Sequence, residues 1–140
     1  MRTIARIDIK NENVIKGINL EGLRKIGNPN KIIKDYYING IDELLIIDSV
    51  ASLYGRNNLF ELIKNITNDI FVPITLGGGI RSLKDIEDAL NSGADKVAIN
   101  SKALESPNFL TEAVSNFGES TIIVNIEAKK IREKNWEPYK

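Results

Sequence analysis

The chain of 140 residues contains 42% hydrophobic and 27% charged residues, which is the balance of a globular protein rather than a disordered one. Lysine and arginine together number 19, as do aspartate and glutamate, so no net charge favours nucleic acid or a membrane surface as a partner. Cysteine and histidine are both absent, which excludes disulfides, zinc–thiolate sites and histidine bases and leaves acid–base chemistry to carboxylates, lysine or tyrosine.

Strand and helix patterns alternate along the whole chain. Short runs of β-branched and apolar residues indicate buried strands, and apolar residues at helical spacing indicate helices. In the first half we expect a strand over residues 3–9, a polar loop containing Gly27-Asn28-Pro29, a helix over 31–39 stopped by Gly40, a strand over 43–48 and a helix over 59–66. In the second half we expect a strand over 72–76, a helix over 82–91 capped by Ser82 with Asp85 and stopped by Gly93, a strand over 96–100, a helix over 108–117 stopped by Gly118 and a fifth strand over 121–128.

This alternation predicts the α/β class. Strands that are apolar on both faces, each followed by a helix, are typical of a parallel sheet covered by helices. Two architectures satisfy that description, an open doubly wound sheet and a closed barrel. No Gly-x-Gly-x-x-Gly pattern follows the first strand, which weakens the dinucleotide-binding form of the open sheet. No linker or shift in composition divides the chain, so we expect one domain over residues 1–140.

An internal repeat favours the barrel. Residues 4–10 and 123–129 share the pattern Ile-x-x-Ile-acid-x-Lys, so the fifth strand would begin a second half that copies the first. The prediction is an incomplete (β/α)8 TIM barrel of about five parallel strands and four helices, because a complete barrel uses roughly 250 residues. The first half barrel would cover residues 1–120 and the start of the second half residues 121–140. Five strands cannot close a barrel, so the first and fifth would have unpaired edges.

Polar residues follow directly after several of the predicted strands, where such barrels carry their chemistry. Asp8 and Glu127 occupy equivalent places in the repeat, and two carboxylates at a barrel mouth can divide the roles of acid and base. Asp48 also ends a strand, although Asp48-Ser49 fits an ordinary loop equally well. We therefore take Asp8 and Glu127 as the candidate catalytic pair.

Two neighbouring loops suggest an anion site. Gly77-Gly78-Gly79 would let backbone amides approach phosphate oxygens, or would simply form a tight turn before the next helix. Asn100-Ser101, after the following strand, would supply donors at the same rim. The candidate phosphate-binding residues are Gly78, Gly79, Asn100 and Ser101, and we expect neither a metal ion nor a cofactor.

Taken together, several stretches resemble one family in register over essentially the whole chain. The first strand and loop carry Asp8-Ile-Lys-Asn-Glu-Asn-Val-Ile-Lys16-Gly17 and Leu23-Arg24-Lys-Ile-Gly27-Asn-Pro29. The later strands carry Gly40-Ile-Asp-Glu43-Leu-Leu-Ile-Ile-Asp48, Pro73-Ile-Thr-Leu-Gly77-Gly-Gly-Ile80 and Gly93-Ala-Asp-Lys96-Val-Ala-Ile-Asn100. These motifs resemble the cyclase subunit family of imidazole glycerol phosphate synthase, a histidine-biosynthesis phosphate-binding barrel.

The resemblance implies an activity and a partner. Members of that family take ammonia from a glutaminase subunit and convert a bis-phosphorylated ribulosyl-aminoimidazole nucleotide to imidazole glycerol phosphate and an aminoimidazole ribonucleotide. By the same resemblance the general acid and base fall on Asp8 and Glu127, and a substrate phosphate on Gly79, Asn100 and Ser101. Lys16 matches a lysine of the first substrate loop. Three members of the charged ring where ammonia enters fall on Arg2, Glu43 and Lys96.

The chain also departs from the family pattern. Glu127 stands where aspartate is usual, Arg6 where a small residue is common, and Asn28 where aspartate is usual. Asp8-Ile-Lys, Ile126-Glu127-Ala and Ala51-Ser-Leu-Tyr54-Gly-Arg56 are similar to a divergent branch that would deliver ammonia to a sugar nucleotide in surface-polysaccharide biosynthesis. A second alternative is an inactive fragment or interaction module that keeps the partner-facing residues without turnover.

Localisation and the tail complete the expectations. No apolar run approaches the about 18 residues of a membrane span, and the first eight residues lack a signal-peptide core, so we expect a cytoplasmic protein without a membrane or nucleic-acid partner. Trp136 and Tyr139 lie in a charged tail where no core is evident, and we expect them to belong to a loop.

Overall fold

One seven-stranded sheet organises the structure. The computed structural model describes residues 1–18, 22–49, 57–132 and 135–138. The strands of this sheet are β1 (Ile4–Lys10), β2 (Asn13–Ile18), β3 (Gly22–Gly27), β4 (Glu43–Asp48), β5 (Ile74–Gly77), β6 (Lys96–Ile99) and β7 (Ile122–Val124). Their spatial order is β3-β2-β1-β4-β5-β6-β7, and β1, β4, β5, β6 and β7 are parallel. The expected five parallel strands are therefore present.

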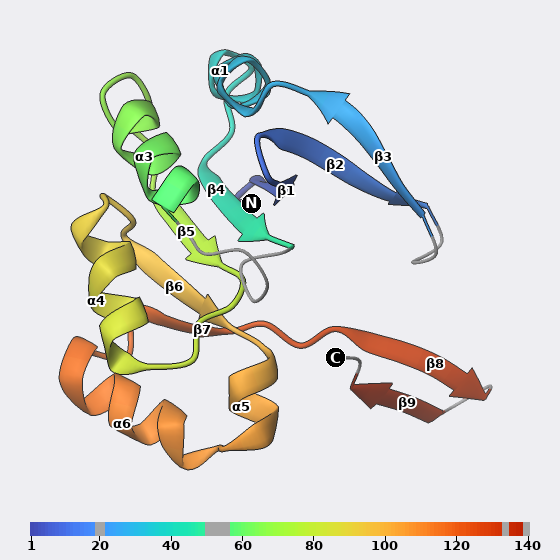
Figure 1. Cartoon of the computed structure of the whole chain (residues 1–140), viewed down its shortest axis with the longest axis vertical. Helices are drawn as coiled ribbons and strands as arrows, with labels where there is room; N and C mark the ends of the chain where they lie inside the picture. The colour runs from blue at the N-terminus through green and yellow to red at the C-terminus, as the bar shows by residue number, and fades with distance from the viewer. Residues whose placement is uncertain (19–21, 50–56, 133–134, 139–140) are drawn as a thin grey trace.

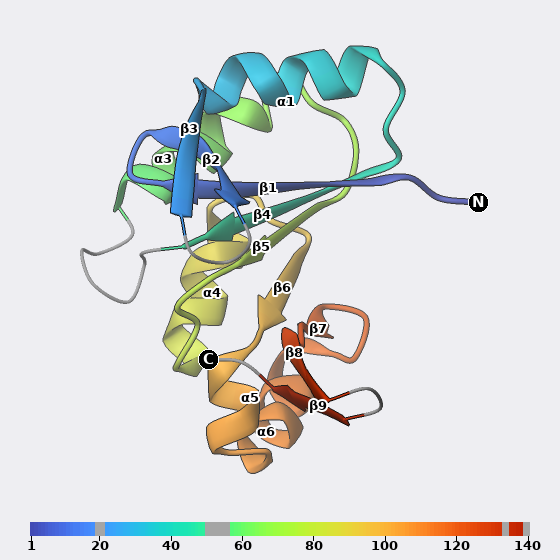
Figure 2. The same cartoon turned by 90° about the vertical axis from the view of Figure 1, so that its right-hand side faces the viewer.

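Helices follow the strands and cover one face of the sheet. They are α1 (Pro29–Ile38), α3 (Asn57–Ile66), α4 (Leu83–Asn91), α5 (Ser101–Glu105) and α6 (Asn108–Phe117). Figure 1 shows α3, α4 and α6 along the convex side of the curved sheet. In Figure 2, turned by 90°, α1 lies above β1 at one end of the sheet and α6 lies at the other. No described helix is long and apolar enough to cross a membrane. The predicted α/β class is confirmed, and the alternating pattern is consistent with a partial barrel of the expected kind.

Alternation along the strands separates the core from the other face of the sheet. In β1, Ile7 and Ile9 are each only 2% exposed and belong to the apolar core, whereas Arg6 and Asp8 point to the opposite face. The helices contribute the fully buried side chains of Ile33 from α1 and Ile63 from α3. Burying one such side chain stabilises the fold by about 1.5–3 kcal/mol. The core thus lies between the sheet and its helices and leaves the other face available for a site.

Helix starts agree with the capping signals in the sequence. Ser82 accepts a hydrogen bond from the backbone of Asp85, and the Asp85 side chain accepts one from the backbone of Ser82, which completes the predicted capping box. Asn28 caps α1 in a similar way by accepting from the backbone N–H of Lys31 at 3.3 Å, and Pro29 takes the first helical position. The side chain of Asn28 therefore has a structural role at this helix start.

The expected polar loop before α1 is wrong, because this segment forms the antiparallel hairpin β2–β3. The apolar pair Val14 and Ile15 is 6% and 9% exposed, and burying it favours a strand over a solvated loop. The hairpin pairs with Asp8–Lys10 of β1, so the expected unpaired edge of the first strand is wrong for that half of β1. The remaining part, Ile4–Ile7, has no partner on that side among the described residues.

The fifth strand is shorter than predicted. It ends at Val124, and the last ladder bond runs from the N–H of Asn125 to the carbonyl of Ile99. Beyond Ile99 the chain of β6 turns into α5, an unpredicted short helix, so Ile126 and Glu127 have no described strand beside them to pair with. The chain continues instead into a separate antiparallel hairpin, β8 (Ala128–Arg132) with β9 (Asn135–Pro138). Trp136 lies on β9, so the expected loop is wrong at this position, and its side chain is 62% exposed. Tyr139 lies outside the described residues.

Candidate active site

A cavity of about 650 Å³ lies at the carboxyl ends of the parallel strands. It is surrounded by residues that follow β4, β5, β6 and β7, together with Arg6 from the interior of β1. The described polar and glycine residues that line it are Arg6, Asp48, Ser49, Gly78, Gly79, Arg81, Asn100, Ser101, Lys102, Glu105, Asn125 and Glu127. Because parallel strands bring their carboxyl ends to one edge, residues far apart in the sequence converge on this cavity.

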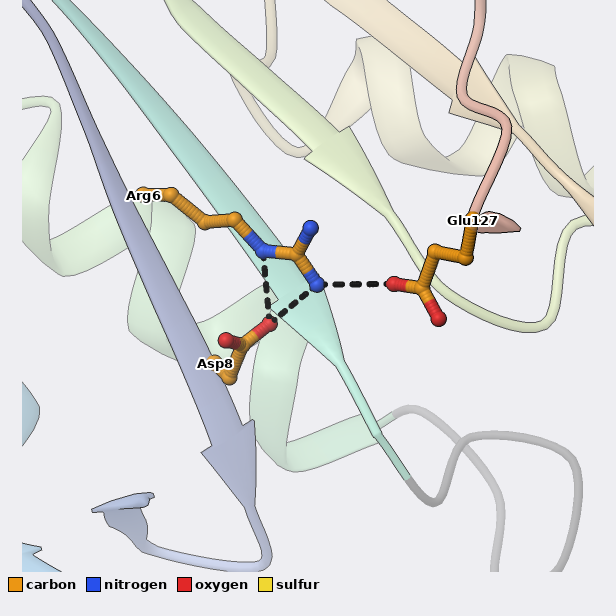
Figure 3. A network of polar contacts seen from close by, with 3 residues as sticks. All are labelled: Arg6, Asp8 and Glu127. Carbon is orange, nitrogen blue, oxygen red and sulfur yellow. Dashed lines mark hydrogen bonds and ion pairs between the residues drawn. The ribbon is translucent and has the colours of Figure 1, made fainter. Parts of the chain in front are cut away.

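Arg6 joins the two candidate catalytic carboxylates (Figure 3). Its Nε and Nη2 donate to Oδ1 of Asp8 at 3.1 and 3.0 Å, and Nη2 also donates to Oε1 of Glu127 at 2.9 Å. Arg6 and Asp8 are two positions apart on one strand and so share a face of the sheet, while Glu127 approaches from the segment after β7. The structure thus brings Asp8 and Glu127 together through a guanidinium that the sequence prediction did not place between them.

The electrostatic setting of Arg6 reflects this arrangement. Partial burial by itself would lower the pKa of Arg6, but the hydrogen bonds and charges of Glu127 and Asp8 outweigh it and raise the pKa above its usual value. The guanidinium is therefore charged at any physiological pH, and the three side chains together carry one more negative than positive charge. All three are partly accessible, with 42%, 31% and 38% of the side chains of Arg6, Asp8 and Glu127 exposed.

The glycine loop after β5 has both a structural and a chemical reason for its sequence. Gly78 and Gly79 have φ values of 98° and 62°, a region that favours glycine. A Cβ on Gly78 would also overlap the backbone of Asp48, so this glycine is needed for the close approach of the β5 and β4 ends. Both glycines line the cavity, where their backbone could face an anion.

Asn100 and Ser101 line the same cavity after β6. Asn100 stands at the cap position of α5, where its side chain makes no capping hydrogen bond, and its buried Oδ1 has no hydrogen-bond partner among the described residues. A buried amide oxygen without a partner costs free energy unless a ligand or water supplies a donor. Ser101 is exposed at the start of the helix. These two residues therefore lie together with Gly78 and Gly79, as expected for one rim.

Two cations of the cavity were missed by the sequence analysis. Arg81 follows the glycine loop and Lys102 follows Ser101, and both line the cavity. The signal was available, because each stands within two positions of a predicted phosphate-binding residue. With Arg6 they make three cations among the described lining residues, and the acids among these residues are also three, Asp48, Glu105 and Glu127. The cavity is thus polar and close to neutral rather than strongly basic.

The other predicted residues lie elsewhere. Lys16 is exposed on β2, in register with Arg24, and does not line the cavity. Arg2, Glu43 and Lys96 are brought together at the amino ends of the strands: Arg2 Nη1 lies 2.7 Å from Oε1 of Glu43, and Lys96 Nζ lies 3.3 Å from Oε2. The stretch Ala51–Arg56, used for the sugar-nucleotide alternative, lies outside the described residues.

Comparison with known proteins identifies the family of the chain. A family model described as histidine biosynthesis protein matches residues 2–138. The chain belongs to that family. It is 51% identical over 137 residues to the imidazole glycerol phosphate synthase subunit HisF of Legionella pneumophila, covering 98% of this chain and 65% of that protein. The subunits of the same name from Campylobacter concisus and Helicobacter hepaticus are 43% and 39% identical, over 93% and 99% of this chain and 52% and 55% of their own lengths.

These histidine-biosynthesis relatives are all longer than the chain. It spans between about half and two thirds of their length, since the covered shares run from 52% to 65%. Membership of the family and the cyclase-type relationship are therefore shown. The activity, substrate and partner of the whole protein belong to the proposal that follows.

Proposed function

We propose that this histidine-biosynthesis family member acts as an ammonia-dependent cyclase-type lyase, converting a bis-phosphorylated ribulosyl-aminoimidazole nucleotide to imidazole glycerol phosphate with ammonia from a glutaminase partner. The observation that carries the proposal is the convergence of Asp8 and Glu127 beside one cavity that also bears Gly78, Gly79 and Ser101. Proton transfer on a phosphorylated substrate needs an acid and a base close to hydrogen-bond donors that bind the phosphate, and this site has two carboxylates beside such donors.

In this proposal each group has a defined task. One substrate phosphate accepts hydrogen bonds from the backbone around Gly78 and Gly79 and from Ser101, with Asn100 as a further contact. Asp8 and Glu127 divide the acid and base roles, and the sequence does not assign which is which. Lys16 contributes a substrate contact from β2. The products are imidazole glycerol phosphate and an aminoimidazole ribonucleotide.

The opposite end of the sheet would receive ammonia. Glu43 is only 6% exposed at its side chain and holds two cations, Arg2 and Lys96, at the amino ends of the strands. A glutaminase subunit docked there would release ammonia at the end of the sheet opposite the cavity. Reaction in the cytoplasm follows from the same proposal.

The deciding experiment is an assay of the whole protein with the bis-phosphorylated nucleotide and ammonium chloride, following formation of imidazole glycerol phosphate. Asp8→Asn keeps the size of the side chain and removes its proton-accepting charge, so turnover should fall by about 10²-fold or more. Lys84→Ala, which removes an exposed i,i+4 pair on α4, is the matched control and should leave turnover unchanged. Unchanged turnover in Asp8→Asn would refute the acid–base assignment.

A second enzyme function is favoured by one specific observation. Each carboxylate accepts from Arg6 through one oxygen, so proton transfer in the cyclase reaction is left to Oδ2 of Asp8 and Oε2 of Glu127. An ammonia-using subunit for amidation of a sugar nucleotide would not need the same acid–base pair. Product formation from a sugar nucleotide, but not from the ribulosyl nucleotide, would favour this second candidate. Binding of the glutaminase without turnover of either substrate would identify an interaction module.

A further inference from the structure

Arg6 and its two partners have hydrogen-bonding groups that no described residue uses. Nε and Nη2 of Arg6 donate to Asp8 and Glu127, whereas Nη1 takes part in no hydrogen bond among the described residues. Each carboxylate uses only one oxygen in these bonds, Oδ1 of Asp8 and Oε1 of Glu127, as Figure 3 shows. The cluster therefore offers the two N–H donors of Nη1 and two further carboxylate oxygens at one place.

This cluster lies across the cavity from the proposed phosphate loop. β4 separates β1, which carries Arg6, from β5, which precedes Gly78 and Gly79. Two strand spacings separate the backbones of β1 and β5 by about 10 Å. Arg6 and Glu127 line the cavity and are 42% and 38% exposed, which leaves them accessible to a ligand. A ligand anchored by phosphate at the loop would present its other end to the cluster.

The charge of the cluster selects the kind of group it can take. Two carboxylates and one guanidinium carry an excess negative charge, which repels a second anion at this position. A hydroxyl group can accept a hydrogen bond from Nη1 of Arg6 and donate one to a free oxygen of Asp8 or Glu127. A keto oxygen can accept from Nη1 alone. The polyol or keto end of a phosphorylated sugar therefore fits both the donors and the charge.

We propose that Arg6 is a ligand-binding and positioning residue, which holds Asp8 and Glu127 in place and binds the hydroxyl or keto end of a sugar phosphate. The inference rests on the phosphate placement at Gly78 and Gly79 that belongs to the proposed function. The inference adds Arg6 to the proposed site as the residue that recognises the end of the ligand opposite the phosphate, through the N–H groups of Nη1.

Calorimetric titration of the whole chain with two probes tests this directly. Inorganic phosphate reports the loop alone, and ribulose 5-phosphate reports the loop together with the cluster. Arg6→Met keeps the apolar stem and removes the guanidinium, so the affinity for ribulose 5-phosphate should fall about tenfold. The affinity for inorganic phosphate should change less than about twofold, because the separation is comparable with the screening length of the buffer. Arg132→Met on the exposed hairpin strand β8 is the matched control and should affect neither probe.

The outcomes separate the two proposals. No loss for either probe would overturn the role of Arg6 and leave the phosphate placement intact, whereas equal losses for both probes would place the phosphate at Arg6 and overturn both proposals. Absence of binding of both probes to the unmodified chain would overturn the phosphate placement itself. Guanidinium at a concentration too low to denature should restore sugar-phosphate binding to Arg6→Ala if the group acts as inferred. Circular dichroism checks that each variant folds. If Arg6→Met does not fold, Arg6→Lys replaces it in the titrations. Lysine keeps the positive charge but lacks the planar guanidinium that bridges the two carboxylates.

Discussion

Glu43 and Lys96 begin strands that are not neighbours in the sheet, yet their side chains form an ion pair of 3.3 Å across the position of β5. The second oxygen of Glu43 binds Arg2 at 2.7 Å, in the segment before β1. A single carboxylate, 6% exposed, thus holds together the amino ends of β1, β4 and β6. The side chain of Arg2 is 69% exposed and that of Lys96 is 26% exposed. The ion pair with the more enclosed lysine therefore contributes more to the stability of the fold.

Removing the charge of Glu43 should destabilise the fold. Glu43→Gln keeps the shape of the side chain but leaves the partly enclosed Lys96 without its counter-charge, and the free energy of unfolding should fall by about 1–3 kcal/mol. Asp88→Asn, which breaks the exposed Lys84–Asp88 pair on α4, should give no measurable change. Urea denaturation gives the free energy of unfolding of both variants. Equal losses would contradict the larger contribution that we assign to the more buried ion pair.

The capping box of α4 should contribute measurably to stability. Ser82→Ala removes the acceptor for the backbone N–H of Asp85 and should lower the free energy of unfolding by about 1 kcal/mol. Ser115→Ala is a matched control, because Ser115 lies inside α6 and donates to the carbonyl of Thr111. Alanine there should be neutral or slightly stabilising. Thermal unfolding distinguishes the two, and a control that fell as far as Ser82→Ala would count against the cap.

Gly78 should not tolerate a side chain. Gly78→Ala places a methyl group against the backbone of Asp48 at a φ of 98°, and we expect a loss of more than about 1 kcal/mol in the free energy of unfolding. Phosphate affinity should fall with it, since the loop must move. Gly17→Ala, where a Cβ meets open space on β2, should have little effect on either quantity. A stable Gly78→Ala with unchanged phosphate affinity would show that this close approach is dispensable.

Ile86 on the buried side of α4 should make a large contribution to the free energy of unfolding. Ile86 is fully buried, so Ile86→Ala should cost about 2–5 kcal/mol through lost burial and a residual cavity. Ile38→Ala at the end of α1 makes the same chemical change at a side chain that is 70% exposed and should cost far less. The two midpoints in guanidinium denaturation should therefore differ clearly, and similar midpoints would contradict the assigned core.

The contribution of Arg6 to stability should not depend on pH in the neutral and mildly alkaline range. Its pKa is raised above its usual value, so the stabilisation is complete below that usual value and is lost only as the pH rises through the higher pKa of the folded state. Arg6→Met should lower the free energy of unfolding by about 1 kcal/mol or less, because the side chain is partly exposed. That difference should be constant between about pH 7 and about pH 10. A difference that shrank within this range would indicate that another titrating group holds the cluster.

Local signals in the sequence predicted most of the parallel fold. The strand over residues 43–48 was placed with its observed bounds, and the helix after Ser82 began where its capping box indicated. Both depend on neighbours within a few positions, which a sequence displays directly. The β2–β3 hairpin was missed because its buried pair, Val14 and Ile15, is too short to stand out among polar residues. The extent of the fifth strand was overestimated because it depends on where β6 ends.

The strand-end residues of the site were predicted, whereas Arg6, Arg81 and Lys102 and the contact from Arg6 to Glu127 were not. Asp8, Glu127, Gly79 and Ser101 follow from strand-end positions, and the structure places them around or next to one cavity. The link from Arg6 to Glu127 joins residues 121 positions apart, and no local spacing encodes it. The roles of these residues in catalysis and binding stay predictions until the assays above are made.

The alternation along β1 has a consequence for how such a protein can change. Ile7 and Ile9 face the helices, while Arg6 and Asp8 lie on the opposite face of the sheet, where Arg6 lines the cavity, so one short strand carries folding and recognition on opposite sides. A substitution at position 6 can alter what the cavity accepts without disturbing the packing beneath it. Single substitutions on the cavity side of β1 can therefore change the ligand preference. A library of variants confined to that side would keep most of its members folded.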